Sequence, residues 1–212
     1  MRKEIEVIFR MGVIAVAVFL SGCGTFSVVR PADTLKSGQF EASGGLTANH
    51  LGEFLFVGKG DFGITDWLEV GAHYEVYSYL IGLRAGLLHT DDHGFALALG
   101  LQTGRTLRLL KVIFSSNDTS SEGAFTVAPS LTLGRRWDQF EPYLGMKVFL
   151  FPSHMDIGGA DFDYIFSGKI GFRFYPSEKI FLFFEGGPSI HKIFLGEQAT
   201  LAEGALGGGL QL

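Results

Sequence analysis

Most of this chain repeats one pattern, in which roughly ten residues alternate between apolar and polar or small side chains and then reach a turn. The clearest example is residues 68–76, where Leu, Val, Ala, Tyr and Val alternate with Glu, Gly, His and Glu. A period of two residues puts successive side chains on opposite faces of an extended chain. The pattern therefore predicts β-strands with one apolar face and one polar face.

Ten segments show this pattern, and the connections between them alternate in character. The predicted strands span residues 38–47, 53–64, 68–76, 79–88, 95–105, 124–136, 140–151, 162–175, 179–192 and 199–212. Compact turns at 65–67, 89–94, 137–139 and 176–178 alternate with connections that are mostly longer or more polar, at 49, 115–123, 152–160 and 196, with 77–78 as a short exception. Short turns at one end and longer loops at the other are typical of transmembrane β-barrels.

The apolar face decides between a membrane barrel and a soluble one. A soluble barrel would cover its outside with charge, whereas charged residues make up only 18% of this chain. The apolar face is unusually aromatic, in a chain that contains 21 Phe residues. We therefore expect an all-β, closed antiparallel transmembrane β-barrel of about ten strands, with eight as the alternative count, because closure leaves no unpaired strand edge in lipid. A soluble β-barrel lipoprotein facing the periplasm is the alternative.

Aromatic residues near the ends of the predicted strands are typical of the girdles that flank a membrane-spanning band. They are Trp67, Tyr74, Tyr79, Trp137, Tyr143 and Tyr175, although Tyr143 falls on the inward phase.

The polar phase predicts what the barrel interior holds. The charged residues and the His on this phase are Glu41, Lys59, Asp61, Glu69, His73, Glu75, Arg84, Glu141, Lys147, Lys169, Arg173, Glu185 and Glu203. A barrel of about ten strands has little room beyond its own side chains. We expect these residues to pair across the lumen as a polar network, with a small selective pore or a ligand cavity as alternatives.

The N-terminus has the layout of a secretory signal peptide. Arg2, Lys3 and Arg10 precede an uncharged run from residue 11 to residue 20, which is shorter than the about 20 residues that a membrane-spanning helix needs. The run ends in Leu20-Ser21-Gly22-Cys23, with the only cysteine of the chain. These four residues resemble a bacterial lipobox, at which lipoproteins are cut before the Cys and acylated on it.

The lipobox resemblance implies how the chain is organised and where it resides. Residues 1–22 would be the signal peptide, 23–37 a tether lipidated at Cys23, and 38–212 the barrel. Gly24, in place of Asp, resembles the outer-membrane class of lipoproteins. The resemblance thus implies the outer membrane of a Gram-negative bacterium, a palmitate-type anchor on the periplasmic side, and the lipoprotein-sorting and barrel-assembly machineries as partners.

The mature region also resembles the small outer-membrane β-barrel superfamily. Residues 63–71 and 174–177 look like its turn-plus-strand repeats, although the chain ends in Leu212 and lacks the terminal aromatic residue common in such barrels. The resemblance implies a lipid-anchored integral barrel with a structural, ligand-binding or narrow-pore role and no enzymatic activity.

An enzymatic alternative rests on Ser189 and His191, which share one strand face, with Glu203 on the next strand. This set resembles that of outer-membrane lipid A deacylases, in which a base activates a serine against an ester, and makes a lipid ester hydrolase the rival function. The turn at 89–93 contains metal-ligand residue types, but its composition is that of a solvated turn, so we predict no metal and no cofactor.

The distribution of charge along the chain indicates which kinds of partner the protein binds. The formal net charge of −5 is spread without long runs, which argues against nucleic-acid binding. Arg105, Arg108 and Lys111 alternate with leucines just after the fifth predicted strand. Because basic residues at headgroup level are attracted to anionic lipids, we predict that these three contact lipopolysaccharide phosphates among the outer-membrane lipids.

Overall fold

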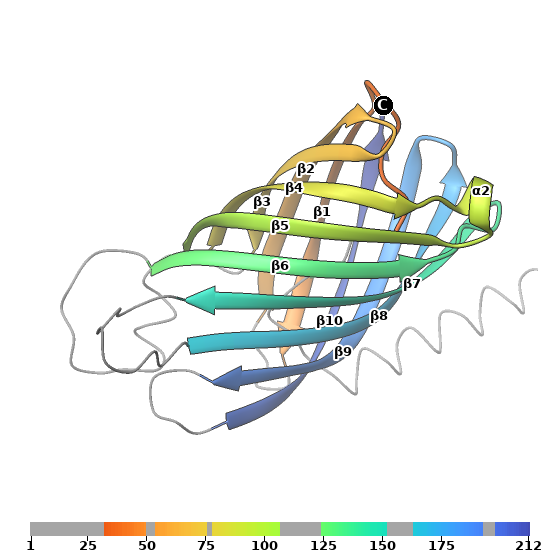
Figure 1. Ribbon diagram of the computed structural model, residues 1–212. Helices are drawn as coiled ribbons and strands as arrows, with labels where there is room; N and C mark the ends of the chain where they lie inside the picture. Colours follow the sequence, from red (N-terminus) through yellow and green to blue (C-terminus); the bar gives the residue numbers. More distant parts are fainter. Residues whose placement is uncertain (1–31, 50–53, 76–77, 107–123, 152–162, 193–197) are drawn as a thin grey trace, which may run out of the picture.

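The computed structural model describes residues 32–49, 54–75, 78–106, 124–151, 163–192 and 198–212, which form one closed β-barrel of ten antiparallel strands (Figure 1). The strands are β1 (Phe40–Asn49), β2 (Phe54–Thr65), β3 (Leu68–Glu75), β4 (Ser78–Leu88), β5 (Ala96–Thr106), β6 (Ala124–Gly134), β7 (Phe140–Phe151), β8 (Asp163–Ser177), β9 (Ile180–Lys192) and β10 (Gln198–Gln211). The predicted closed antiparallel β-barrel is confirmed, with ten strands and not eight, and every predicted strand boundary lies within two residues of the observed one.

Each strand pairs with its neighbours in sequence, and β1 closes the ring by pairing with β10. At the seam, Phe40 and Leu212 exchange backbone hydrogen bonds of 2.9 and 2.8 Å. Side chains alternate between the two faces of each strand. Because strands that are adjacent in sequence also pair in space, these faces join into one outer and one inner surface of the barrel.

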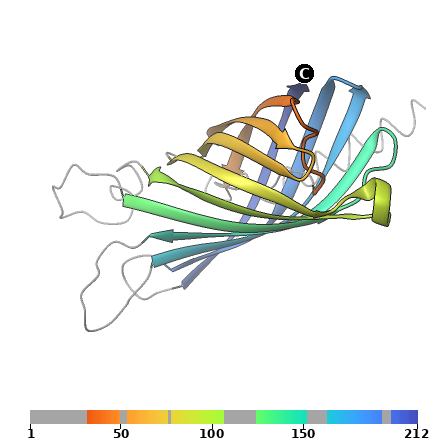
Figure 2. The same ribbon diagram turned by 45° about the horizontal axis from the view of Figure 1, so that its top comes forward.

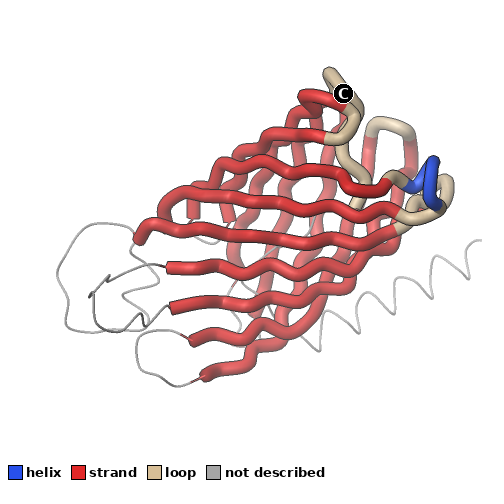
Figure 3. Tube along the Cα trace, in the orientation of Figure 1, coloured by secondary structure: helices blue, strands red, loops and turns tan. Residues whose placement is uncertain are grey.

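The two ends of the barrel differ. The compact turns, the start of β1, the end of β10 and a short helix α2 (Thr90–His93) lie together at one end, here called the turn end (Figures 1 and 3). Gly94 ends α2 with a φ of 74°, a left-handed conformation that favours glycine. The opposite end is here called the loop end, and Figure 2 shows the described strands running from the turn end towards it.

The outer face is apolar. Large hydrophobic side chains stand exposed along the middle of the strands, among them Ile170 at 71%, Ile81 at 64% and Leu101 at 57% of their surface. Among the strand side chains that the structure describes, Arg105 is the one charged group on this face. No helix in the described ranges is long and apolar enough to cross a bilayer.

The predicted girdle residues divide between the two faces. Trp67 and Trp137 are exposed at the turn end, and Tyr79 is exposed near the loop end with its ring centroid 5.0 Å from that of Tyr74. Tyr175 was predicted for the girdle, and this was wrong, because its side chain points into the barrel and its hydroxyl donates a 2.7 Å hydrogen bond to Glu141. Tyr143 is also interior, as its phase indicated.

Candidate functional site: the barrel interior

The structure places all the ionisable residues of the polar phase inside the barrel, where their side chains are buried. They are seven acids (Glu41, Asp61, Glu69, Glu75, Glu141, Glu185 and Glu203), five bases (Lys59, Arg84, Lys147, Lys169 and Arg173) and His73. A buried charge is costly unless it is paired and hydrogen-bonded. The partners of each group therefore decide what the interior can do.

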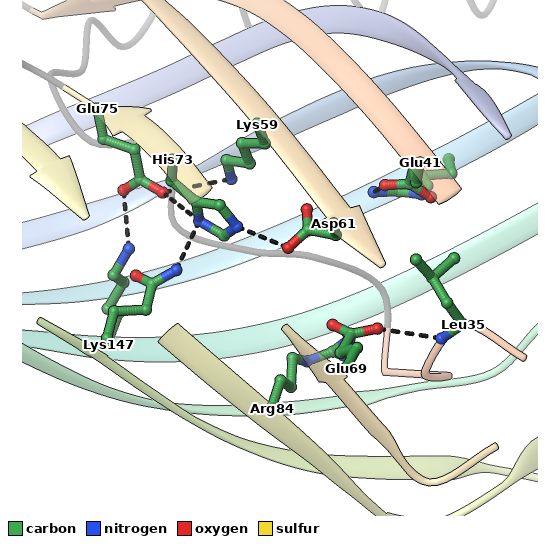
Figure 4. Close-up of polar contacts among 11 residues, drawn as sticks. Leu35, Glu41, Lys59, Asp61, Glu69, His73, Glu75, Arg84 and Lys147 are labelled. Atoms are coloured by element: carbon green, nitrogen blue, oxygen red, sulfur yellow. Dashed lines mark hydrogen bonds and ion pairs between the residues drawn. The ribbon is translucent and has the colours of Figure 1, made fainter. Parts of the chain in front are cut away.

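The central cluster is built around Glu75 (Figure 4). Lys147 Nζ donates to Glu75 Oε2 at 2.8 Å from the far wall of the barrel, and Lys59 Nζ lies 3.7 Å from Glu75 Oε1. His73 Nδ1 is 3.4 Å from the same Oε1. One carboxylate thus joins β2, β3 and β7 across the lumen.

His73 extends this cluster towards the turn end (Figure 4). Its Nε2 lies 2.8 Å from Asp61 Oδ1, and the Gln102 amide nitrogen lies 2.5 Å from its Nδ1. Since an ionised carboxylate only accepts, Nε2 carries the proton of the bond to Asp61. Gln102 was not predicted as a network member, although its place on the inward phase of β5 was a usable signal.

Glu69 and Arg84 form a second cluster nearer the turn end. Arg84 Nη1 donates to Glu69 Oε1 at 3.0 Å, and the backbone N–H of Leu35 donates to Glu69 Oε2 at 3.0 Å. Leu35 belongs to the segment predicted as a tether, so part of that segment contributes to the interior.

A third cluster joins β8 to β1. Arg173 donates from both terminal nitrogens to the two oxygens of Glu41, at 2.8 and 2.9 Å. This bidentate geometry is the strongest form of arginine–carboxylate pairing. The guanidinium also lies 4.0 Å from the ring centroid of Phe181, which packs under it in the interior.

Tyrosine hydroxyls serve two further acids. Tyr175 donates to Glu141 at 2.7 Å, and Tyr143 donates to Glu185 at 3.3 Å. Acids outnumber bases in the interior, and these neutral donors solvate carboxylates without adding charge. Both tyrosines were missed as interior donors, although period-two alternation from Arg173 puts Tyr175 on the inward phase.

The residues of the hydrolase alternative lie on the inner face of β9 and β10. Ser189 is fully buried and its Oγ donates to Ser167 Oγ at 3.0 Å. Glu203 accepts from Lys169 Nζ at 2.5 Å. The side chain of His191 lies outside the described part of the structure. Ser189 and Glu203 thus take part in a buried polar cluster that faces away from the outer surface.

Apolar side chains also face the interior towards the loop end, beside the hydrogen-bonded hydroxyls of Ser78, Thr106 and Thr126. Val57, Leu80, Phe149 and Ile165 are inward-facing and at most 1% exposed, so the inner face is not polar at every position. Lys147 Nζ lies 4.6 Å from the Phe149 ring centroid, so Phe149 packs directly against the ionic network.

One small cavity lies within the network, beside Asp61, Glu69, His73 and Arg84. Its volume is about 30 Å³, and Gln102, Ser130 and Thr132 also line it. This is enough for water but not for an organic ligand. Glycines make the space for the polar groups, since a Cβ at Gly71 would lie 1.9 Å from Asp61 Oδ1.

The remaining predicted residues lie at the barrel ends. Arg105 is exposed on the outer face, paired in register between Tyr79 and Phe125. Arg108 and Lys111 fall outside the described residues, as do Cys23 and the predicted signal peptide. In the turn predicted to be solvated, Thr90 bonds to Asp33 through its N–H at 3.0 Å and its hydroxyl at 2.6 Å.

Comparison with known proteins finds fold likeness only. No family model and no curated protein matches the chain. Similar solved structures include the N-terminal β-barrel domain of Pseudomonas aeruginosa OprF, at 12% identity and a TM-score of 0.35, covering 84% of this chain and 100% of that one. Neisserial surface protein A is 15% identical with a TM-score of 0.32, covering 82% of this chain and 94% of that one. Ail of Yersinia pestis is 12% identical with a TM-score of 0.29, covering 83% and 99%. Scores this low support no functional argument.

Proposed function

We propose that this protein is an integral outer-membrane β-barrel lipoprotein with a structural role, anchored by acylated Cys23, whose filled interior makes it a scaffold and not a pore. The observation that carries the proposal is the outer surface. Exposed large apolar side chains cover it, and Arg105 is the single charge among its described strand residues. A contiguous apolar surface of this size is unfavourable in water and suits lipid.

The height of the apolar band supports a membrane-spanning position. From Phe95 at the turn end to Arg105 near the loop end the chain advances ten residues. At about 3.3 Å per residue and a strand tilt of about 40°, this distance corresponds to about 25 Å along the barrel axis. Outer-membrane barrels carry an apolar band of about this height. A soluble barrel facing the periplasm has no use for such a band.

The two ends fit the orientation that an N-terminal lipid requires. Both ends of the described strand ring lie at the turn end, so an acyl group on Cys23 and the turns would share the periplasmic side. Trp67 and Trp137 are exposed there, and the Arg135 guanidinium lies 5.4 Å from the Trp137 ring centroid. Such pairs suit the headgroup level of the inner leaflet.

Near the loop end, the outer face carries a basic residue that suits a contact with lipopolysaccharide. Arg105 stands exposed between Tyr79 and Phe125, where a cation beside aromatic rings meets the edge of the apolar band. We propose that Arg105, together with Arg108 and Lys111, contacts lipopolysaccharide phosphates. Changing all three to Gln should reduce the lipopolysaccharide that co-purifies at low salt, and unchanged retention in the folded variant would refute the contact.

The interior supports a scaffold better than either rival. An ester hydrolase acting on lipid would need its serine to reach the membrane face, and Ser189 is buried on the inner face against Ser167. A narrow pore would need a continuous path, and the described interior is crossed by ion pairs such as Lys147–Glu75 and holds buried apolar side chains such as Phe149.

Heat-modifiable migration tests the membrane barrel directly. Mature protein solubilised in detergent should migrate faster on an SDS gel before boiling than after, and it should stay in the membrane during carbonate extraction. A peripheral lipoprotein would be held by its lipid alone. Release from the membrane after changing Cys23→Ala would therefore contradict an integral barrel.

Fatty-acid labelling tests the anchor independently. Wild-type protein should incorporate a fatty-acid analogue, and Cys23→Ala should abolish incorporation and leave an unprocessed precursor. Continued labelling of the Ala variant would contradict acylation at Cys23 without touching the barrel assignment.

A further inference from the structure

The segment that precedes β1 crosses the mouth of the barrel at the turn end. Residues 32–38 are called the strap. At its C-terminal end the N–H of Gly38 donates to Gly63 O at 2.8 Å, and the N–H of Ser37 donates to Asp66 Oδ1 at 2.9 Å. Gly38 adopts a φ of 81°, which turns the chain into β1 and favours glycine at this position.

The middle of the strap enters the lumen. Leu35 is 4% exposed, and its N–H donates to Glu69 Oε2 at 3.0 Å (Figure 4). Thr34 Oγ1 donates to Asp66 O at 2.8 Å. An added methyl group on Gly86 would lie 2.8 Å from Thr34 Oγ1, so the wall is shaped to admit this residue.

The N-terminal part of the strap reaches the opposite wall. Asp33 accepts both hydrogen bonds from Thr90, and Ala32 is completely buried. A Cβ on Gly134, at the end of β6, would lie 3.3 Å from Ala32 Cβ. In a ring of ten strands β1 and β6 are farthest apart, so the strap spans the full mouth.

We propose that the strap acts as a lid that closes the turn-end mouth over the Glu69–Arg84 cavity. Glu69 links the strap to the cavity wall, because its Oε1 accepts from Arg84 and its Oε2 accepts from the N–H of Leu35. The strap therefore completes the solvation of a buried acid that would otherwise face the turn-end water. The inference concerns the barrel alone and holds whether or not Cys23 is acylated.

A buried cysteine tests the lid. Thr132 lines the cavity and is 4% exposed. In full mature protein in detergent, Thr132→Cys should react with a charged methanethiosulfonate at least tenfold more slowly than Asp138→Cys in the exposed turn. Adding Leu35→Asp, which sets a second carboxylate against Glu69, should raise the Thr132→Cys rate at least tenfold. The parent protein measures any background from Cys23.

Lys36→Asp is the matched control, because it adds negative charge to the exposed neighbour of Leu35. It should leave the Thr132→Cys rate unchanged. Heat-modifiable migration reports whether each variant is folded, and Asp33→Ala combined with Thr34→Ala replaces Leu35→Asp if that variant does not fold. Fast labelling behind an intact strap, or an unchanged rate when the strap of a folded variant is weakened, would overturn the lid.

Discussion

At the scale of single residues, the interior is held by specific partners for each buried charge. Tyr175 illustrates this, since its hydroxyl serves Glu141 Oε2 and the other oxygen, Oε1, has no hydrogen-bond partner within the described structure. The carboxylate therefore depends on one neutral donor. Losing a donor to a buried polar group costs more than the bond itself contributes, because the group stays desolvated.

Tyr175→Phe should accordingly destabilise the barrel by about 1 to 3 kcal/mol, which is the usual penalty for leaving a buried polar group unsatisfied. Tyr79→Phe, on the exposed outer face, should change stability by less than about 0.5 kcal/mol, as surface substitutions do. Urea titrations of both variants in lipid vesicles measure the difference. Equal effects would mean that the Tyr175 hydroxyl contributes nothing at its site.

The Arg173–Glu41 pair supports a second residue-scale prediction. Arg173→Met leaves the Glu41 carboxylate buried without its bidentate partner, and breaking a buried ion pair in this way typically costs about 3 to 5 kcal/mol. The double variant Arg173→Met/Glu41→Leu should recover part of this loss, because no uncompensated charge remains. Lys179→Met in the exposed turn is the control. If the double variant lost more unfolding free energy than the two single variants lose together, the result would contradict the pairing.

At the scale of elements, the strands were predictable because each carries its own signal. Alternation with a period of two predicted all ten strands, and Glu69 and His73 in β3 and Arg173 in β8 lie on the inner face that their polar phase predicted. Tyr175 was placed on the wrong face because an aromatic residue near a strand end suits both a girdle and an interior hydrogen bond. Local composition does not separate these two roles; the phase of the strand does.

The strap was not predictable for a different reason. Residues 32–38 contain small and polar side chains with no period, which is also the composition of a flexible tether. Their placement depends on partners far along the chain, such as Glu69 and Thr90, that only the closed ring brings together. The ion-pair partners inside the lumen were unpredictable for the same reason, since Lys147 and Glu75 are 72 residues apart in the sequence and lie on different strands.

The facing of the strands gives an element-scale prediction. Ile170→Arg at the middle of β8 should cost about 2 to 4 kcal/mol in lipid vesicles, because it puts a charge at the bilayer midplane. Ile180→Arg, at the turn-end start of β9, should cost about 0 to 1 kcal/mol near the interface. Both positions are exposed isoleucines on the outer face, at 71% and 45%. Folding titrations that give equal, small costs would place the outer face in water.

At the scale of the whole molecule, the barrel combines an apolar outside with an inside that its own side chains fill. Arg173–Glu41 lies towards the turn end and Lys147–Glu75 joins two walls across the lumen, while Phe149 is buried towards the loop end. The cavity beside Asp61 and Arg84 has a volume of about 30 Å³. We therefore expect no continuous aqueous path for ions through the described interior.

Purified protein reconstituted into a planar bilayer should therefore show no stable unitary conductance, whereas an open porin studied in the same bilayer does. The strap adds one obstacle at the turn end, but ion pairs such as Lys147–Glu75 lie beyond it. Leu35→Asp should consequently expose Thr132 to reagents and still leave the bilayer silent. Stable current steps from the folded wild-type protein would contradict the scaffold role, and steps from Leu35→Asp alone would make the strap, not the ion pairs, the barrier to ions.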